Sequence, residues 1–528
     1  MITGWNLYKN SEQLKKLNFE NCLIGKKGQR GQQPEIMYKK GDMEMGKQTA
    51  WEEIDKKSSE IFTASDEIWG CAETAFTEDK SMKILCDVLK AEGFTVETGL
   101  ADVKTAFKGT FGSGKPVIGI LGEFDALSGL DQEAGATEKI VVHDGASGHG
   151  CGHNMLGTAS LSAAIGIKKY LEESGKPGTV IYFGCPGEEG GSGKSFMARD
   201  GVFDNLDFAV TWHPGDKNVV SVGSSLANYQ IIYRFYGQAS HAAACPELGR
   251  SALDAVELMN TGVQYLREHI IQEARIHYAI TNTGGYSPNV VQPYSEVLYL
   301  IRAPKNSQVK EIYERVNDIA RGAALMTGTK MELQFVKACS NLVDNTVMEE
   351  IMQKNLEEIE REPYTAEEIE FARKIGETFG GNHVDIQDVL VRYEKSRKAA
   401  VEQFLAPHAD DVINDFIVPL MDTEECLKGS TDVGDVSWVC PTAQINAVTE
   451  AAGTPGHSWQ MVSQGKSSIA HKGMQFAGKV MAGTVIDMLE KPELIEEAKK
   501  ELRRRVGAEG YIPPIPEGIR PMAINPKK

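Results

Sequence analysis

Three short apolar runs, each bounded by glycine or proline, place the strongest constraint on the fold. They are VIGILGEF (117–124), TVIYFGC (179–185) and FAVTWH (208–213). Near-continuous apolar runs of this length are typical of parallel strands that are buried on both faces. Between the first two runs lies LGTASLSAAIGIKKYLEES (156–174), an Ala-rich segment that we expect to form a helix. This alternation of strands and helix predicts an α/β fold with a doubly wound sheet.

The length of the chain, 528 residues, exceeds what one hydrophobic core usually organises, so we expect at least two domains. From about residue 226 the pattern changes to YQIIYRFYGQ, a long helical segment, VLYLIRAP and another helical segment. Two alternating-face strands and two helices predict a smaller α+β domain at 226–344. It would be inserted into a first domain that is made of residues 48–225 and 345–528.

Two further segments stand apart from these domains. Residues 355–425 are charged and helical in pattern, and Thr365 with Glu368 forms a capping box that opens a helix. We interpret this region as an added helical hairpin. Residues 1–47 are polar and basic without a sustained period of 3.6 or 2, which predicts an appended N-terminal extension.

Charge and cysteine content exclude several classes of protein. With 56 Lys and Arg against 74 Asp and Glu, the net charge is −18, and the basic residues do not form a dense cluster. We therefore expect no nucleic-acid partner. Nine cysteines scattered along a long chain do not form a disulfide framework, which favours a reducing compartment. Because no apolar run reaches membrane-spanning length and the N-terminus lacks a signal-peptide core, we expect a cytoplasmic protein without a membrane partner.

The stretch GHGCGHN (148–154) precedes the Ala-rich segment and is the first motif that carries chemistry. Cys151 and His153 are two residues apart, too close to share a helix face but suited to a loop that turns both side chains toward one point. The positive end of the following helix favours a thiolate. Taken alone, a buried cysteine beside a hydrogen-bonded histidine is an equally good interpretation.

Three further motifs add donors at one edge of the predicted sheet. Glu188 and Glu189 directly follow the second apolar run, at the carboxyl end of a strand, where ligands bind in α/β sheets. Because adjacent side chains diverge, one carboxylate can bind a metal while the other faces a water as a base. His213 ends the third run, and His457 follows a turn far along the chain. One thiolate, one carboxylate and three imidazoles suit two divalent ions such as zinc or manganese.

The segment GSGKS (191–195) resembles a phosphate-binding loop. That motif requires glycine at the position of Glu188, and two carboxylates in the loop would repel phosphate. We therefore reject a nucleotide triphosphatase.

In their order and spacing, GHGCGHN, GEEGG, TWHPG, SHAAACPELGRSALDAVELMN and SPNVVQP resemble the aminoacylase and carboxypeptidase-type metallohydrolases, in the branch of the plant auxin-conjugate hydrolases. The similarity covers roughly residues 48–490. It implies two divalent metal ions, Mn²⁺ or Zn²⁺, in the first domain, and a lid and dimerisation role for residues 226–344. It also implies hydrolysis of the amide bond of an N-acyl or N-aroyl amino acid, and p-aminobenzoyl-glutamate is the substrate that we expect.

The resemblance assigns a role to individual residues. Glu188 matches the general base. His241 matches a histidine of the inserted domain that reaches the active site of a partner subunit, in a homodimer or in a heterodimer with a related subunit formed through the lid domain. Asn289 and Arg302 match positions that hold a substrate carboxylate. The metal ligands would be Cys151, which bridges, with His153, Glu189, His213 and His457.

One departure from the family concerns the residue that follows His153. This chain has Asn154 where many relatives have aspartate, so a supporting carboxylate is lost at that position. Asp125, in GEFDALSG, matches a position near the metals, and we expect it to supply that support.

Three alternatives stay open. A thiol hydrolase with Cys151 as nucleophile and His153 as base explains a single motif, and loss of activity on chelation would contradict it. A non-catalytic partner subunit would keep the metal site without activity, although the retained Glu188 argues against it. A dipeptidase or an N-acetyl-amino-acid deacylase is the runner-up activity, because the substrate contacts cannot be read from the sequence.

Overall fold

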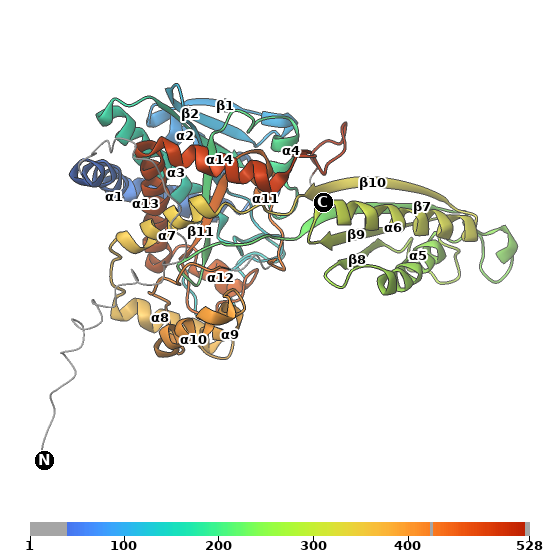
Figure 1. The fold of residues 1–528 in the computed structure, drawn as a ribbon. Helices are drawn as coiled ribbons and strands as arrows, with labels where there is room; N and C mark the ends of the chain where they lie inside the picture. Colours follow the sequence, from blue (N-terminus) through green and yellow to red (C-terminus); the bar gives the residue numbers. More distant parts are fainter. Residues whose placement is uncertain (1–39, 423–425, 523–528) are drawn as a thin grey trace, which may run out of the picture. The chain divides into compact units, whose positions relative to one another are not determined.

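The larger of two sheets carries the three apolar runs. In the computed structural model, which describes residues 40–422 and 426–522, seven strands of that part form this sheet in the order β1-β2-β4-β3-β5-β11-β6 (Figure 1). The four strands β4, β3, β5 and β11 are parallel to their neighbours within this group, and the other pairings are antiparallel. The strands are β1 (Thr95–Thr98), β2 (Phe107–Ser113), β3 (Val117–Glu123), β4 (Gly178–Cys185), β5 (Phe208–Gly215), β6 (Val219–Val220) and β11 (Thr442–Val448).

Helices cover both faces of this sheet, which confirms the doubly wound α/β fold. Helices α3 and α13 pack on one face, and α4 and α11 pack on the other. The helices are α1 (Lys40–Cys71), α2 (Asp79–Ala91), α3 (His153–Ser174), α4 (Gly193–Arg199), α5 (Ala252–Leu266), α6 (Asn306–Thr327), α7 (Thr346–Glu358), α8 (Ala366–Glu377), α9 (Ile386–Leu390), α10 (Lys395–Leu405), α11 (Val433–Val439), α12 (Trp459–Gln464), α13 (Ser468–Glu490) and α14 (Pro492–Val506).

Alternate side chains of each central strand supply the two cores. In β3, Ile118 and Ile120 enter the core beneath α3, whereas Leu121 enters the core on the opposite face. Gly157 lets α3 lie directly on the end of β3, because a Cβ at this position would stand 2.7 Å from the carbonyl oxygen of Glu123. The sequence of α3 is rich in Ala, Ser and Gly for this reason, and almost the whole helix is buried.

The strand order creates a switch point beside β3. The chain leaves β3 for β4 on one side and then crosses to β5 on the other side of β3. In such sheets the crevice beyond the carboxyl ends of the strands is the usual ligand site. This edge therefore marks where functional side chains should gather.

The second sheet lies in residues 227–339 and has four antiparallel strands in the order β10-β7-β9-β8. Helices α5 and α6 pack on it. Our expectation of two strands was wrong, because the segments that form β8 and β10 were missed. In β8, Ile276, Tyr278 and Ile280 stand two residues apart, a strand signal that sequence reasoning overlooked, although almost all side chains of this edge strand are exposed. The strands are β7 (Ala227–Tyr236), β8 (Arg275–Asn282), β9 (Tyr294–Ala303) and β10 (Lys330–Cys339).

The charged insertion is also more elaborate than a hairpin, since it contains α8, α9 and α10. The capping box that opens α8 is confirmed. The Thr365 hydroxyl accepts from the N–H of Glu368 at 3.3 Å, and the Glu368 carboxylate accepts from the N–H of Thr365 at 2.7 Å. The limits proposed for the domains stay predictions.

Helix α1 begins at Lys40, inside the segment that we expected to be an extension without periodicity. Lys47 is buried in this helix, and its ammonium pairs with Glu358 at 2.8 Å and with Asp487 at 2.7 Å. The rest of the expected extension, residues 1–39, lies outside the described residues. Among the helices that are described, none is both long enough and apolar enough to cross a membrane.

Candidate metal centre

The chemically active side chains lie at the carboxyl ends of the parallel strands. β3 ends at Glu123, β4 ends at Cys185 just before Glu188 and Glu189, and His213 lies near the end of β5. In the register of β3 with β4, Glu123 stands opposite Cys185. The motifs that follow separate apolar runs are therefore brought to one edge of the sheet, as we expected from the strand pattern.

The turn between Cys151 and His153 is tight. Cys151 lies in the loop that enters α3, and His153 is the first residue of this helix. Gly152 has a φ of 72°, in the left-handed region that glycine adopts without steric cost. A Cβ at Gly152 would also stand 2.6 Å from Cε of Met155 and 2.8 Å from Cε of Met461. Glycine therefore suits this turn better than a residue with a Cβ, and the turn directs the two flanking side chains into the same space.

Two groups of metal donors share Cys151. In one group, donor atoms of Cys151, His153 and His213 all lie within 4.8 Å of one another, and in the other the same holds for Cys151, Glu189 and His457. Sγ of Cys151 is 3.3 Å from Nε2 of His213, and Nε2 of His457 is 3.2 Å from Oε1 of Glu189. All five residues predicted as ligands thus lie together, and Cys151 belongs to both groups; its bridging role stays a prediction.

Hydrogen bonds at Nδ1 orient two of the histidines. Nδ1 of His153 lies 2.9 Å from Oδ1 of Asp125, and Nδ1 of His213 lies 2.7 Å from the carbonyl oxygen of Pro214. A proton on each Nδ1 leaves Nε2 with the lone pair that a metal binds. Nε2 of His153 is buried and makes no hydrogen bond, although Oε2 of Glu123 lies 3.3 Å away, and a bound ion would satisfy this nitrogen. Asp125, which also accepts from the N–H of Glu189 at 3.0 Å, gives the support that we expected.

His457 is held in place by its backbone. Its φ of 53° lies in the left-handed region, which is costly for a residue with a Cβ, at about 1–3 kcal/mol. Its N–H donates to the carbonyl oxygen of Gly150 at 2.9 Å, so the loop that bears His457 is fixed against the loop that bears Cys151. Strained backbone of this kind is commonly found where function demands an exact side-chain position.

Burial and neighbouring charge shift the pKa values of the donors. Burial raises the pKa of the Cys151 thiol, and the charge of Glu189 raises it further. Burial also raises the pKa of Glu188, to which Glu123 and then Glu189 add by repulsion. The hydrogen bond to Glu189 raises the pKa of His457. A bound cation would relieve the repulsion between these crowded acidic groups. The sulfur, nitrogen and oxygen donors fit a divalent metal such as Zn²⁺ or Mn²⁺.

Asn154 does not take part in this centre. Its amide donates to Oγ of Ser65 and to the carbonyl oxygen of Gly465, both at 3.0 Å, and it is fully buried. These contacts tie α3 to α1 and to the end of α12, so this departure from the family pattern has a structural role.

Sequence reasoning missed a second layer of charged residues beneath the donors. Nζ of Lys194 is 2.7 Å from Oε1 of Glu123 and 2.5 Å from Oδ1 of Asp432, and all three side chains are buried. Glu123 could have been found, because it ends an apolar run at the same edge as Glu188. Lys194 was seen only as part of the rejected phosphate-binding motif, and its pairing with carboxylates agrees with that rejection.

The residues predicted on the smaller sheet lie apart from the donor groups. His241 is exposed, and its Nδ1 accepts from the N–H groups of Ala243 and Ala244 at 3.2 and 3.1 Å. Asn289 is exposed as well, and its carbonyl oxygen accepts from the N–H of Ala242 at 2.9 Å. Arg302, in β9, donates from Nη1 to Oγ of Ser430 at 3.2 Å, while its Nε is buried without a partner.

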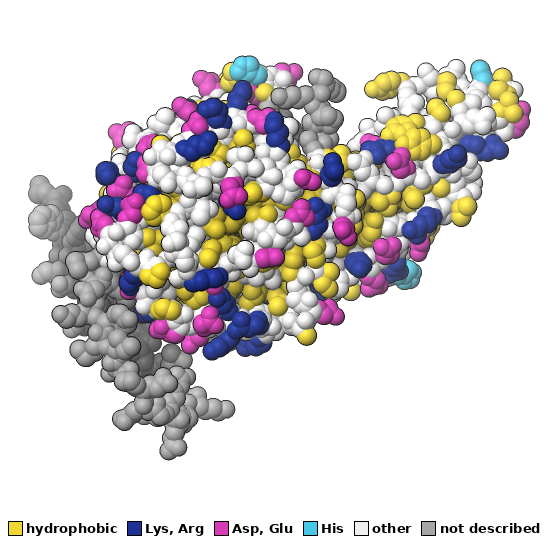
Figure 2. Space-filling view, turned by 90° about the horizontal axis from the view of Figure 1, so that it is seen from above, with side chains coloured by type: hydrophobic (Ala, Val, Ile, Leu, Met, Phe, Trp, Pro, Cys, Tyr) yellow, Lys and Arg dark blue, Asp and Glu magenta, His cyan; other side chains and the backbone are white. Residues whose placement is uncertain are grey.

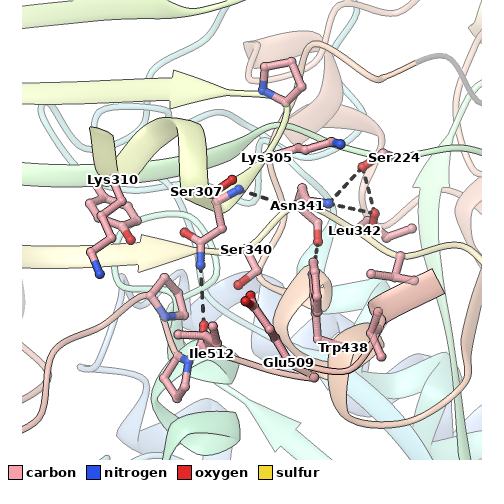
Figure 3. Close-up of a pocket in the computed structure, with 18 of the residues that line it drawn as sticks. Ser224, Lys305, Ser307, Lys310, Ser340, Asn341, Leu342, Trp438, Glu509 and Ile512 are labelled. Carbon is pink, nitrogen blue, oxygen red and sulfur yellow. Dashed lines mark hydrogen bonds between the residues drawn. The ribbon is translucent and has the colours of Figure 1, made fainter. Parts of the chain in front are cut away.

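A cavity of about 1140 Å³ lies elsewhere in the chain (Figure 3). It is lined by the start of α6, the segment after β10 and the C-terminal segment, and includes Lys305, Asn341 and Ile512. None of the residues that we predicted for the site lines it, so the metal donors and this cavity are separate features.

Known proteins resemble this sequence over most of its length. The chain is 48% identical over 461 residues to the B subunit of the p-aminobenzoyl-glutamate hydrolase of Escherichia coli strain K12, across 87% of this chain and 95% of the relative. It is 27% identical over 486 residues to the Xaa-Arg dipeptidase of Mus musculus, across 89% of this chain and 95% of that protein.

Solved structures share the fold. The crystal structure of the aminobenzoyl-glutamate utilization protein from Klebsiella pneumoniae superposes with a TM-score of 0.53 at 14% identity, covering 83% of this chain and 97% of that one. Residues 119–496 match the peptidase family M20/M25/M40. This match and the 48% identity over nearly the whole E. coli relative show that the chain is a hydrolase belonging to peptidase family M20/M25/M40.

Proposed function

We propose that the chain hydrolyses the amide bond of N-acyl or N-aroyl amino acids, with p-aminobenzoyl-glutamate as the principal substrate and two divalent metal ions as cofactors. The observation that carries this proposal is the pair of donor groups that share Cys151, with Glu188 beside them. The name of the E. coli relative, which is 48% identical, supports the substrate.

Bound divalent ions would polarise the scissile carbonyl and lower the pKa of a water molecule. The residues of the chain supply the proton transfers. Glu188 forms a third group of possible donors with Glu123 and His153, and the resemblance to the family assigns it the role of general base rather than of ligand. Its raised pKa, caused by burial and then by Glu123, suits a group that takes a proton from water and passes it to the leaving amine.

Arg302 and Asn289 are proposed to hold the carboxylate of the substrate. The buried Nε of Arg302 has no hydrogen-bond partner, and an unpaired guanidinium donor is costly unless an anion meets it. Asn289 is exposed in the turn between β8 and β9, beside the loop of His241 and at the opposite end of β9 from Arg302, so it would join the contact from a partner chain.

We further propose that residues 226–344 form a lid and dimerisation domain. β8 is one of the two edge strands of the smaller sheet, the other being β10, and Tyr278 and Ile280 on β8 are 43% and 40% exposed. Figure 2, seen from above the view of Figure 1, shows hydrophobic side chains among charged ones on the surface of the smaller domain, at its right. An apolar edge strand is a ready site for pairing with another chain. The partner is a second copy of this chain, or a related chain such as the A subunit of the E. coli hydrolase.

The exposed His241 fits this assembly. Its Nδ1 accepts two backbone N–H groups of its own loop, which leaves Nε2 free to reach outward. In a pair formed through the smaller sheets, His241 of one chain would stabilise the oxyanion in the site of the other. A site completed by its partner would explain why the histidine lies apart from the donors within one chain.

The decisive experiment is hydrolysis of p-aminobenzoyl-glutamate by the purified chain, followed by detection of p-aminobenzoate and glutamate. Chelation should abolish the activity, and Zn²⁺ or Mn²⁺ should restore it. An analogue with its glutamate carboxylates amidated should be cleaved far more slowly. Activity that survives complete chelation would favour the thiol hydrolase, in which Cys151 is the nucleophile.

Control substrates separate the remaining candidate functions. Faster turnover of dipeptides, including Xaa-Arg, or of N-acetyl amino acids than of p-aminobenzoyl-glutamate would overturn the substrate assignment but keep the reaction type. If the chain binds metal but cleaves none of these compounds, with or without a related chain, it is a non-catalytic partner.

A further inference from the structure

A fully buried lysine lies directly after the loop that carries Glu188 and Glu189. Lys194 is the second residue of α4, and no part of its side chain reaches solvent. Nζ pairs with Oε1 of Glu123 at 2.7 Å and with Oδ1 of Asp432 at 2.5 Å, and its backbone N–H donates to Oδ2 of Asp432 at 2.9 Å. The proton transfers proposed above make no use of this ammonium.

Glu123 joins the lysine to the metal centre. While one of its carboxylate oxygens pairs with Lys194, the other lies 3.3 Å from Nε2 of His153, the atom that faces the metal position. Carboxylate oxygens of Glu123 and Glu188 and a ring nitrogen of His153 all fall within 4.8 Å of one another. The ammonium therefore sets where the Glu123 carboxylate stands relative to both His153 and Glu188.

The neighbouring residue is anchored in the same way. Oγ of Ser195 donates to Oδ2 of Asp435 at 2.6 Å, one turn of α11 beyond Asp432. Two consecutive residues of α4 are thus bound to two carboxylates of the α11 region. This fixes one end of the loop of Glu188 and Glu189, whose other end is fixed by β4.

We propose that Lys194 is a positioning residue of the metal centre, acting through Glu123 on His153 and through α4 on the loop of Glu188. The proposal rests on the proposed metal-dependent hydrolysis. It predicts that loss of the ammonium impairs metal binding and turnover, although Lys194 touches neither metal nor substrate. A purely structural lysine would affect only the stability of the fold.

Lys47 provides a matched control. It too is a buried lysine with two carboxylate partners, Glu358 at 2.8 Å and Asp487 at 2.7 Å, but it belongs to α1 and pairs with α7 and α13. Lys194→Met and Lys47→Met remove the same charge from two similar environments. Each variant is stripped of metal, and its affinity for Zn²⁺ is measured by competition with a chromogenic chelator, together with melting temperature, kcat and KM.

Both variants should melt at lower temperature than the wild type. Lys194→Met alone should bind Zn²⁺ roughly 10–100-fold more weakly, the usual effect of removing a group that orients a ligand, and should lose kcat with little change in KM. Folded Lys194→Met with wild-type Zn²⁺ affinity and kcat would overturn the inference. If the wild type binds no Zn²⁺ or cleaves no amide, the proposed function fails instead.

A second pair of variants keeps the inference testable if Lys194→Met does not fold. Glu123→Gln preserves the size of the side chain and should also weaken Zn²⁺ binding, whereas Ser195→Ala, which breaks the tie to Asp435 without changing charge, should weaken it less. In the double variant Lys194→Met with Glu123→Gln, the loss of affinity should not exceed the larger single loss. Additive losses would mean that the lysine does not act through Glu123.

Discussion

Glu188 and Glu189 are neighbours in the sequence but have different surroundings, and this difference gives a sharp test at the scale of single residues. Glu189 belongs to the group of Cys151 and His457, whereas Glu188 is grouped with Glu123 and His153. Because Glu188 is proposed as the general base and not as a ligand, Glu188→Gln should keep its metal and lose roughly two to four decades of kcat, the contribution of a positioned acid and base. Glu189→Gln should lose metal, which elemental analysis of the purified variants would detect. Equal metal loss in both variants would contradict the assignment of Glu188 as base and Glu189 as ligand.

Glu349 offers a test of pH dependence far from the metal donors. It is buried in α7, and burial, followed by repulsion from Asp344, raises its pKa from 4.5 to about 8. A raised carboxyl pKa stabilises the fold at low pH, and this stabilisation is lost as the pH rises from 4.5 toward 8. In this window Glu349→Gln should gain about 1.4 kcal/mol per pH unit relative to the wild type. Urea unfolding between pH 5 and 8 measures this gain, and parallel stability curves would contradict it.

The ligands could be predicted at the residue scale because each lies in a short motif at the end of a strand or beside a glycine turn. The supporting residues were harder to find. Asp125 was found through the family resemblance, but Lys194 and Asp432 were not, because a buried ion pair forms between segments more than two hundred residues apart. No local pattern in the sequence records such a pairing.

At the scale of elements, buried strands were predictable and exposed ones were not. β3, β4 and β5 are buried on both faces and can be recognised in the sequence as apolar runs. β8 has mostly exposed side chains and was missed. The alternating Ile276, Tyr278 and Ile280 of β8 are a weaker signal than a continuous apolar run, because they span only five residues. The number of strands in the smaller sheet was therefore known only from the structure.

The exposed face of β8 makes a prediction of its own. Replacing Tyr278 and Ile280 together by lysine should weaken association through the edge of this sheet by about tenfold or more, because like charges would then face each other. Metal content should not change. Sedimentation velocity over a range of concentrations measures the effect, and Leu325→Lys, at an exposed position of α6, serves as the control. An unchanged sedimentation profile would exclude β8 as the pairing edge.

At the scale of the whole molecule, the proposed sharing of His241 can be tested by mixing two inactive variants. His241→Ala and Glu188→Ala are combined under conditions that allow subunits to exchange. In a mixed dimer, one site carries both defects and the other carries neither, so up to a quarter of wild-type activity should return if half of the dimers are mixed. No recovery despite demonstrated exchange would mean that His241 acts within its own chain or has no part in the reaction.

The sharing of Cys151 by both donor groups has a consequence for how the protein is handled. Because one sulfur serves both metal positions in the proposed centre, damage to a single atom would disable both at once, and no half-active species would accumulate. Chelated protein carries this sulfur without a bound ion, as a thiol whose raised pKa keeps it protonated, so oxidation in air should be slow and should accumulate only over long storage. Metal added back after such storage would then find no intact thiol, and a preparation stored without a reductant would be mistaken for an inactive protein.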